Sequence, residues 1–408
     1  MSRKRLILAL CLGVLPVVFI GCWGSNDSNQ DPFVYPFRAV VVDPASSSRV
    51  YAVSEGGGFF RTADGGKTWV QPISGLAPDV RVEALAVDPN VTPTNDPAPT
   101  CPTIPTSTML YLGDENTGLY RSLNEGTNWA LQGLSPNITD IVVDRTTSKC
   151  TPRDQACTDI YASSQTSGIV RSQDRGLTWD NFNANLASQS VSALTIFNGA
   201  NPATLYAGTE EGFVFRRRLD QPTWTPADAP QPIDPSIGET EIIALTVDPS
   251  NAAILYAGLS GGEGGRRPGS GLYQSADAGV SWTNVQRPDR VFTDSVHVVQ
   301  FVLATAPGAG CDTNTIKKEF LFTNINRVSF QEYPGGVWQS PALDDDNFSN
   351  VGVTAIAVSE FYGAADPKPD DPKVIYAGTY NKGLWKSCDG GHHWTVMNLA
   401  GDVNNLPC

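Results

Sequence analysis

Five eight-residue segments of the 408-residue chain follow one pattern, which constrains the fold more than any other feature. Each begins with Ser or Thr, carries Asp or Asn at its third position and Gly at its fifth, and ends with Trp. The segments are 62–69, 122–129, 172–179, 275–282 and 387–394. A pattern of this length that recurs five times at similar spacing indicates an internal repeat.

An aromatic residue upstream of each segment extends the repeat. In most repeats it lies 18 residues before the terminal Trp, and this offset also identifies two repeats whose final segment has diverged. One repeat has a longer offset of 26 residues. The seven pairs are Tyr51–Trp69, Tyr111–Trp129, Tyr161–Trp179, Tyr206–Trp224, Tyr256–Trp282, Phe320–Trp338 and Tyr376–Trp394.

Each repeat contains four short segments with strand character. Strand A is an apolar run that often ends in Val-Asp, as at Val87-Asp88, and strand B is of the Tyr-Ala-Gly type. Strand C is of the Gly-Leu-Tyr-Arg-Ser type, and strand D is expected to begin at the terminal Trp. Four strands every 45–60 residues are typical of a β-propeller. We therefore predict an all-β, seven-bladed propeller over residues 37–408, with four-stranded antiparallel blades.

The eight-residue segment itself suits a sharp turn between strands C and D. An Asp or Asn side chain can accept backbone N–H groups in such a turn, and Gly adopts positive φ without steric cost. The Trp then buries a large ring against the turn. Because nothing in this chemistry requires a ligand, we interpret the central residues as structural; they are Asp64, Asn124, Asp174, Asp277 and Asp389.

The segment resembles the Asp box, or BNR repeat, and the resemblance extends from about Phe37 to the C-terminus. Asp boxes occur in bacterial sialidases, two-domain xyloglucanases, the luminal domain of sortilin-like receptors and a photosystem II assembly factor. Sialidases resemble the chain least, because they use six blades and an Arg-Ile-Pro element that is absent here. Xyloglucanases place catalytic carboxylates between two propellers, and this chain has length for one. The receptors and assembly factors, which bind rather than catalyse, are more similar.

Strand alternation places the B–C and D–A loops together on the face opposite the boxes, which we call the candidate face. In Asp-box enzymes the corresponding face holds the site. The charged and amide residues predicted there are Glu55, Asp114, Glu115, Glu210, Glu211, Glu263, Arg266, Arg267, Asn326 and Arg327 in B–C loops, and Arg81, Glu239, Asp289 and Arg290 in D–A loops. Two carboxylates across a pocket can hydrolyse a glycosidic bond, whereas isolated loop charges are usually solvated.

The N-terminus predicts export. Arg3, Lys4 and Arg5 precede an apolar run over residues 6–20, which is short for a transmembrane helix but suits a signal peptide. The run ends in Phe-Ile-Gly-Cys, which resembles the lipobox of bacterial lipoproteins and implies lipid attachment at Cys22. We predict a signal peptide over 1–21, a polar tether over 22–36 and a membrane-anchored or secreted protein outside the cytoplasm.

Six cysteines follow Cys22, an even number that favours disulfides in an exported chain. Because the repeats run from A to D in order, no blade is shared between the chain ends, and we expect Cys388–Cys408 to secure the ring. That pairing would leave Cys150 with Cys157, and Cys101 and Cys311 either paired with each other or free. The alternative joins Cys101 to Cys150 or Cys157, and Cys311 to Cys388 or Cys408.

The net charge of −14 argues against a nucleic-acid partner. Three histidines and the absence of Cys-x-x-C predict no metal site and no cofactor. We interpret Arg216-Arg217-Arg218 as a local loop charge, with a docking patch as the alternative. Two functions remain open: a non-enzymatic, monomeric binding or assembly module for a protein or glycan ligand, or an extracytoplasmic glycosidase acting on the candidate face.

Overall fold

The computed structural model describes residues 36–56, 58–72, 75–77, 79–88, 108–134, 137–144, 158–226, 232–235, 240–248, 251–260, 271–285, 298–302, 317–323, 327–333, 352–358, 374–380, 382–388, 393–397 and 399, with backbone alone for the three ranges between 298 and 333. The chain divides into two compact units, Met1–Phe33 and Val34–Cys408. The predicted signal peptide and Cys22 lie outside the described residues, and all of the described strands belong to the second unit.

The described strands form seven antiparallel sheets, each made of consecutive strands. Sheet 1 contains β1 (Phe37–Asp43), β2 (Ser46–Ser54) and β3 (Gly58–Thr62). Sheet 2 contains β4 (Val82–Asp88), β5 (Met109–Asp114), β6 (Gly118–Ser122) and β7 (Ala130–Leu131). Sheet 3 contains β8 (Ile138–Asp144), β9 (Asp159–Ser164), β10 (Gly168–Ser172) and β11 (Asp180–Asn181).

The remaining four sheets come next in chain order. Sheet 4 contains β12 (Val191–Phe197), β13 (Thr204–Thr209), β14 (Val214–Arg218) and β15 (Thr225–Pro226). Sheet 5 contains β16 (Ile242–Asp248), β17 (Asn251–Leu259), β18 (Gly271–Ser275) and β19 (Thr283–Asn284). Sheet 6 contains β20 (Val298–Val302), β21 (Lys317–Thr323) and β22 (Arg327–Tyr333), and sheet 7 contains β23 (Val353–Val358), β24 (Ile375–Thr379), β25 (Leu384–Ser387) and β26 (Thr395–Val396).

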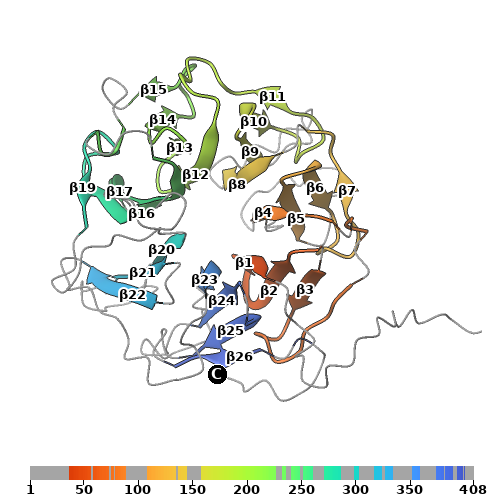
Figure 1. Ribbon diagram of the computed structural model, residues 1–408. Helices are drawn as coiled ribbons and strands as arrows, with labels where there is room; N and C mark the ends of the chain where they lie inside the picture. Colours follow the sequence, from red (N-terminus) through yellow and green to blue (C-terminus); the bar gives the residue numbers. More distant parts are fainter. Residues whose placement is uncertain are drawn as a thin grey trace, which may run out of the picture. The chain divides into compact units, whose positions relative to one another are not determined.

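The first strands of the sheets contact one another in a closed circuit. β1 contacts β4, and the circuit continues through β8, β12, β16, β20 and β23 before returning to β1. Figure 1 shows the sheets radiating from this inner ring, with the last sheet beside the first. The predicted all-β propeller with antiparallel sheets is confirmed.

The prediction of four strands per sheet is met in five sheets, and sheet 1 shows why it is not met there. In sheets 2, 3, 5 and 7, the residue three positions after the box Trp donates its N–H to strand C, as Gln132 does to Leu119 O at 2.8 Å. In sheet 1 this position is Pro72, which has no N–H to donate. A single bridge between Arg61 and Val70 replaces the fourth strand. The segment after β22 in sheet 6 lies outside the described residues.

The fourth strands begin one residue after the box Trp rather than at it, because the Trp side chain packs inward. Trp69, Trp129 and Trp394 are all buried, whereas the two residues of β7 and β26 are exposed. In the five four-stranded sheets the outermost strand is therefore only two residues long, which limits edge-to-edge pairing with other chains.

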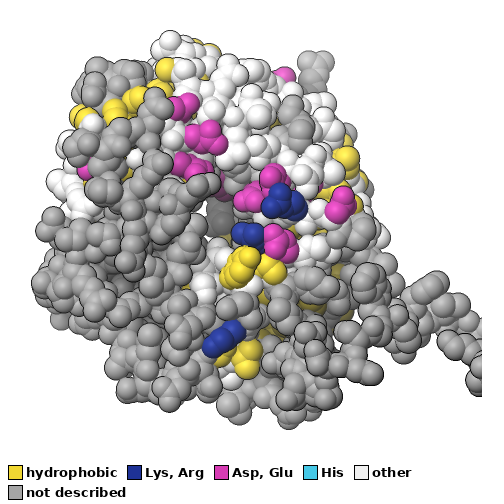
Figure 2. All heavy atoms as spheres, viewed as in Figure 1, with side chains coloured by type: hydrophobic (Ala, Val, Ile, Leu, Met, Phe, Trp, Pro, Cys, Tyr) yellow, Lys and Arg dark blue, Asp and Glu magenta, His cyan; other side chains and the backbone are white. Residues whose placement is uncertain are grey.

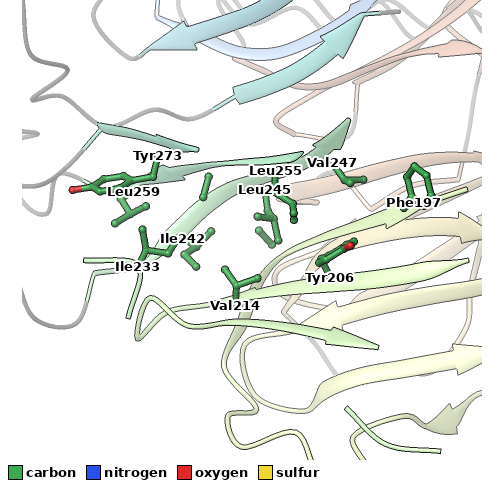
Figure 3. Packing of buried hydrophobic residues seen from close by; sticks show 12 residues of the cluster. Phe197, Tyr206, Val214, Ile233, Ile242, Leu245, Val247, Leu255, Leu259 and Tyr273 are labelled. Carbon is green, nitrogen blue, oxygen red and sulfur yellow. The ribbon is translucent and has the colours of Figure 1, made fainter. Parts of the chain in front are cut away.

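The hydrophobic core lies between neighbouring sheets rather than within any one of them. One cluster joins Tyr206 and Val214 of sheet 4 to Ile242, Leu255 and Tyr273 of sheet 5, and Figure 3 shows these side chains meeting across the interface. Equivalent clusters join sheets 1 and 2, 2 and 3, and 3 and 4. We call each such interface a seam.

Glycines in the second strands allow the sheets to approach closely. A Cβ added to Gly113 or Gly208 would lie 2.7 Å from a side-chain carbon of Ile138 or Ile242, the first residue of the next sheet. Contacts this short do not occur between real carbon atoms, so the Tyr-Ala-Gly signature of strand B reflects close packing at the seam.

Six inner strands, all except β20, carry a β-bulge near their start, and in three of them the hydroxyl of the bulged residue bonds across the seam. Thr139 donates its hydroxyl to Val191 O and Ser192 donates to Ile242 O, both at 2.8 Å. Thr354 makes the equivalent bond to Phe37 O, across the junction of the last and first sheets. The two chain ends are therefore joined by the same bond that joins other seams.

Candidate functional site

Two charged residues replace the bulge hydroxyls in sheets 1 and 2. The bulges place Arg38 and Glu83 at the positions that Thr139, Ser192 and Thr354 occupy elsewhere. Since the inner strands begin at the candidate face, these charges lie where the central channel opens onto it. Figure 2 shows acidic and basic side chains gathered around an opening at the centre of one face.

Ion pairs organise this side of the channel mouth. Arg38 pairs with Glu55 at 2.7 Å, and Arg81 pairs with Glu115 at 2.8 Å. Burial raises the pKa of Glu83, an effect that the nearby Arg38 opposes and that the Glu115 carboxylate adds to. Three predicted residues, Glu55, Arg81 and Glu115, are thus brought together around Glu83.

A second group of carboxylates lies across sheets 4 and 5. Ser188 donates to Glu211 at 2.9 Å. Burial and the neighbouring Glu211 raise the pKa of Glu210, and burial together with Glu210 raises the pKa of Glu241. The predicted pair Glu210 and Glu211 therefore joins Glu241 in a separate acidic group, rather than meeting Glu55.

Asp114 does not belong to the exposed face. It is fully buried, and its carboxylate accepts the backbone N–H groups of Arg81 and Thr117, each at 2.6 Å. The expectation of a ligand-facing Asp114 is thus wrong, because the loop uses this carboxylate to close its own turn and to hold the preceding D–A connection.

The remaining predicted residues are not placed. Glu239, Glu263, Arg266, Arg267, Asn326, Asp289 and Arg290 lie outside the described residues, and for Arg327 the structure describes the backbone alone. Their convergence with the two described groups stays a prediction.

The sequence reasoning missed three residues of the mouth. Arg38 and Glu83 fall inside apolar strands, and the signal that identifies them is a charge at the position where other repeats carry Thr or Ser. The third is Tyr380, an exposed aromatic that lies directly after β24. The Arg38 guanidinium lies 6.0 Å from its ring centroid, a cation–π distance.

A cavity of about 570 Å³ lies along the axis of the inner ring. Its walls come from β1, β4, β8, β12, β16 and β23, and many of the lining side chains are aliphatic, among them Val41, Leu85, Val142, Ile196 and Ile356. Asp43 and Asn198 lie at the end nearer the box turns. The volume falls within the range of small-ligand sites, roughly 300–1,000 Å³.

The box turns lie away from this cavity, and their polar groups serve the turn. Asp64 Oδ1 accepts Thr68 N at 2.9 Å, and Thr68 Oγ1 donates to the other carboxylate oxygen at 2.6 Å. Asp174 and Asp277 make equivalent bonds, and Asn124 accepts the corresponding N–H at 2.8 Å. Asp389 lies outside the described residues.

Each described box turn is also bound by the preceding sheet around the ring. Its fourth residue has positive φ, which turns the carbonyl toward a basic side chain of strand C in that sheet. The four donors and acceptors are Arg61 to Glu125 O at 2.9 Å, Arg121 to Arg175 O at 2.9 Å, Arg216 to Ala278 O at 3.2 Å and Lys386 to Gly65 O at 2.8 Å. The last of these, with Tyr376 donating to the same oxygen at 2.9 Å, spans the ring junction.

The cysteine prediction is tested only at Cys388. This residue forms a disulfide, but the other cysteines lie outside the described residues, so its pairing with Cys408 stays a prediction. The ring junction has side-chain bonds besides any disulfide, from Thr354, Tyr376 and Lys386 of sheet 7 to sheet 1.

The three consecutive arginines are used largely within the fold. Arg216 binds the next box turn, and the Arg217 guanidinium lies 3.6 Å from the ring centroid of Phe182. Arg218 is exposed and pairs with Asp220 at 2.6 Å. This arrangement fits a local role rather than a docking patch.

Two kinds of feature are absent from the described part of the chain. It contains no helix that is long and apolar enough to cross a membrane. The same residues include no group of three or more His, Cys, Asp or Glu side chains arranged to hold a metal ion.

Comparison with known proteins gives the fold and a distant sequence relative. No family model matches the chain. The xyloglucanase Xgh74A of Acetivibrio thermocellus is 25% identical over 297 residues, which cover 62% of this chain and 32% of that protein. The chain therefore spans about a third of the length of this curated relative.

Solved structures share the propeller fold. A YCF48 protein bound to a D1 peptide has a TM-score of 0.54 at 15% identity, over 88% of this chain and 95% of that one. An ancestral GH74 enzyme also has a TM-score of 0.54, at 16% identity, over 88% of this chain and 46% of that one. The chain is thus a β-propeller similar in fold to YCF48 and to one part of GH74 enzymes.

Proposed function

We propose that this protein is an exported, membrane-tethered, seven-bladed Asp-box propeller that binds a protein or glycan ligand on its candidate face. The observation that carries the proposal is the channel mouth, where Arg38, Glu55, Arg81, Glu83 and Glu115 gather beside the exposed Tyr380. Charged groups with an exposed aromatic are the features that recognition surfaces use for orientation and contact area.

The neighbours support binding as the role. The YCF48 structure, which matches this chain over nearly its whole length, contains a bound peptide. In our chain the described box turns are occupied by bonds within and between sheets, so the candidate face is the better place for a ligand.

Site-specific photo-crosslinking in the native host tests this proposal. A photo-reactive phenylalanine analogue replaces Tyr380 on the candidate face, and a matched variant carries it at Leu131, an exposed residue on the outer edge of sheet 2. We expect a discrete crosslinked partner or glycan conjugate from position 380 alone. Equal crosslinking from both positions, or none from position 380, would contradict the proposal.

The second candidate function is glycoside hydrolysis, favoured by the sequence similarity to a xyloglucanase. It needs two carboxylates about 5–10 Å apart across the site. The described candidates are Glu83 with Glu55 or Glu115, and Glu210 with Glu211 or Glu241. Purified protein incubated with xyloglucan would release reducing ends, and Glu83→Gln would abolish the release. Absence of product from the wild type would leave the binding role.

We further propose that the mature chain begins at Cys22 and is acylated there. Two acyl chains anchor a protein stably, whereas one gives marginal binding. Metabolic labelling with a palmitate analogue should mark the wild type and not Cys22→Ala. Equal labelling of both proteins would contradict acylation at Cys22.

A further inference from the structure

One inner-strand position carries an acid where every other sheet with described side chains carries alanine. Asp140 is the first residue after the bulge of β8 and pairs with Ser163 of β9. The equivalent residues of sheets 1, 2, 4, 5 and 7 are Ala39, Ala84, Ala193, Ala244 and Ala355. The fold therefore does not require a carboxylate at this place.

The carboxylate lies between the inner strands β8 and β12, next to residues that line the axial cavity. Asp140 Oδ2 accepts the N–H of Leu194 at 2.9 Å, and Oδ1 accepts the N–H of Ile141 at 2.8 Å. β12 is the inner edge strand of its sheet, so an N–H of Leu194 that is bonded outside the sheet points away from β13. Ile141 and Thr195, the residues that follow along the two strands, line the axial cavity.

The environment of this carboxylate lacks a positive charge. Burial raises the pKa of Asp140 to about 6, and the two backbone hydrogen bonds oppose that rise. Each oxygen uses one of its acceptor positions on the backbone, which leaves further lone pairs. Among the described residues, no Lys or Arg forms an ion pair with it.

The groups on either side of Asp140 define what can approach it. On the candidate face the described loops and strand starts carry three basic residues, the paired Arg38 and Arg81 and also Lys382, against six glutamates, Glu55, Glu83, Glu115, Glu210, Glu211 and Glu241. This excess of carboxylates attracts cations. On the other side lies the cavity of about 570 Å³, where aliphatic side chains stand among polar groups; its described carboxylate, Asp43, is already paired with Arg49.

From this arrangement we infer that the central channel binds a primary ammonium group carried on an aliphatic chain, with the ammonium on Asp140 and the chain in the axial cavity. A lysine side chain and the free N-terminus of an apolar peptide both present this chemistry. The inference rests on the proposed binding function and names the ligand class that the channel takes.

Calorimetric titration with three six-carbon probes tests the inference. Hexylammonium, hexan-1-ol and hexanoate share an aliphatic chain and differ in the charge of their polar end. We expect the wild type to bind hexylammonium most tightly and hexanoate least. In Asp140→Asn the preference for hexylammonium over hexanol should fall by about tenfold, the factor expected for loss of one charge-assisted hydrogen bond.

Two further variants keep the test decisive. Asp140→Ala installs the residue of the other sheets, so it remains informative if Asp140→Asn does not fold. Asp220→Asn makes the same change of charge at an exposed position and should leave the preference unchanged. Equal binding of the three probes by the wild type, no binding of hexylammonium, or an equal effect of Asp220→Asn would overturn the inference.

A final arm separates the two sources of the ammonium group. One tripeptide amide carries a free N-terminus and only leucines, and the other is N-acetylated and carries a single lysine. Binding of either one, lost in Asp140→Ala, supports the inference, and binding of neither overturns it for peptides. If crosslinking at Tyr380 succeeds while all ammonium probes fail, the inference is wrong and the proposed binding function stands.

Discussion

The two seams that flank sheet 4 are held by different chemistry. Toward sheet 5, Arg216 donates to Ala278 O in a box turn, and Tyr206 donates to Ala252 O at 2.9 Å. Toward sheet 3 there is no box turn in sheet 4 to accept such a bond. The strand C arginine of sheet 3, Arg171, instead pairs with Asp159 of its own sheet at 2.5 Å.

Aromatic packing replaces the box turn at the seam between sheets 3 and 4. Phe182 lies 5.0 Å from the Tyr161 ring, 6.2 Å from the Trp224 ring and 3.6 Å from the Arg217 guanidinium. Its carbonyl accepts Trp224 Nε1 at 2.7 Å and Arg217 at 3.2 Å. A repeat can therefore lose its box when one residue of the neighbouring sheet supplies both an apolar side chain and a backbone carbonyl acceptor.

The largest expected effect is at this seam without a box. Phe182→Ala removes the ring that Arg217, Tyr161 and Trp224 share, and should lower the free energy of unfolding by about 3–5 kcal/mol. Urea denaturation measures it, and Phe182→Leu should cost clearly less because it keeps an apolar side chain. A loss below about 1 kcal/mol would show that the seam is not held by Phe182.

At the seam between sheets 2 and 3, removal of the hydrogen bond from Arg121 to the box turn should lower the free energy of unfolding by less. Arg121→Met deletes the donor to Arg175 O but keeps the aliphatic stem, with an expected loss of about 1–2 kcal/mol. Tyr111 donates to the same oxygen at 3.1 Å. The double variant with Tyr111→Phe should therefore cost more than the sum of the single changes, and strict additivity would argue against a shared acceptor.

Acid should weaken the box-bearing seams selectively. Burial raises the pKa of Asp277, but hydrogen bonds from Ser281 and neighbouring groups outweigh it, so the net pKa is lowered from 3.8. A carboxylate whose pKa is lower in the folded state stabilises the fold above its unfolded value and loses that stabilisation as pH falls through the folded value. The free energy of unfolding, measured between about pH 5 and about pH 2.5, should fall less steeply with decreasing pH in Asp277→Asn than in the wild type.

The smallest expected effect concerns Lys386. At the ring junction it donates to a box-turn carbonyl, as Arg61, Arg121 and Arg216 do at other seams. Burial lowers the pKa of Lys386 from its ordinary value of 10.5. Between the folded and unfolded values the unfolded chain holds more protons, so stability rises with pH. Wild-type stability, measured by urea unfolding up to about pH 10.5, should therefore rise relative to Lys386→Arg, whose guanidinium stays charged. A constant difference would contradict this assignment.

Much of the architecture was readable from the chain alone. The boxes, the Tyr-to-Trp offsets and the Val-Asp endings identified the repeats and the order of strands A to D, because each depends on local turn and strand chemistry. Sheet 1 departed from the pattern because of Pro72. In other sheets the residue at this position donates its N–H to strand C, and proline has no N–H to donate. The candidate face was less readable, since Asp114 is charged by type but buried by tertiary structure.

What the sequence determined by itself is the repeat, because all of its signals lie within a single repeat unit. What only the tertiary structure decided is which residues of different repeats meet. Arg61 and Glu125 are 64 positions apart, and Lys386 and Gly65 are 321 apart, yet both pairs make the same bond. Asp140 stands out only when the bulges are used to align it with the alanines of other sheets, and when its bond to Leu194 is seen. Closing a ring brings such distant positions together, and no local pattern in the chain records which of them will face the channel.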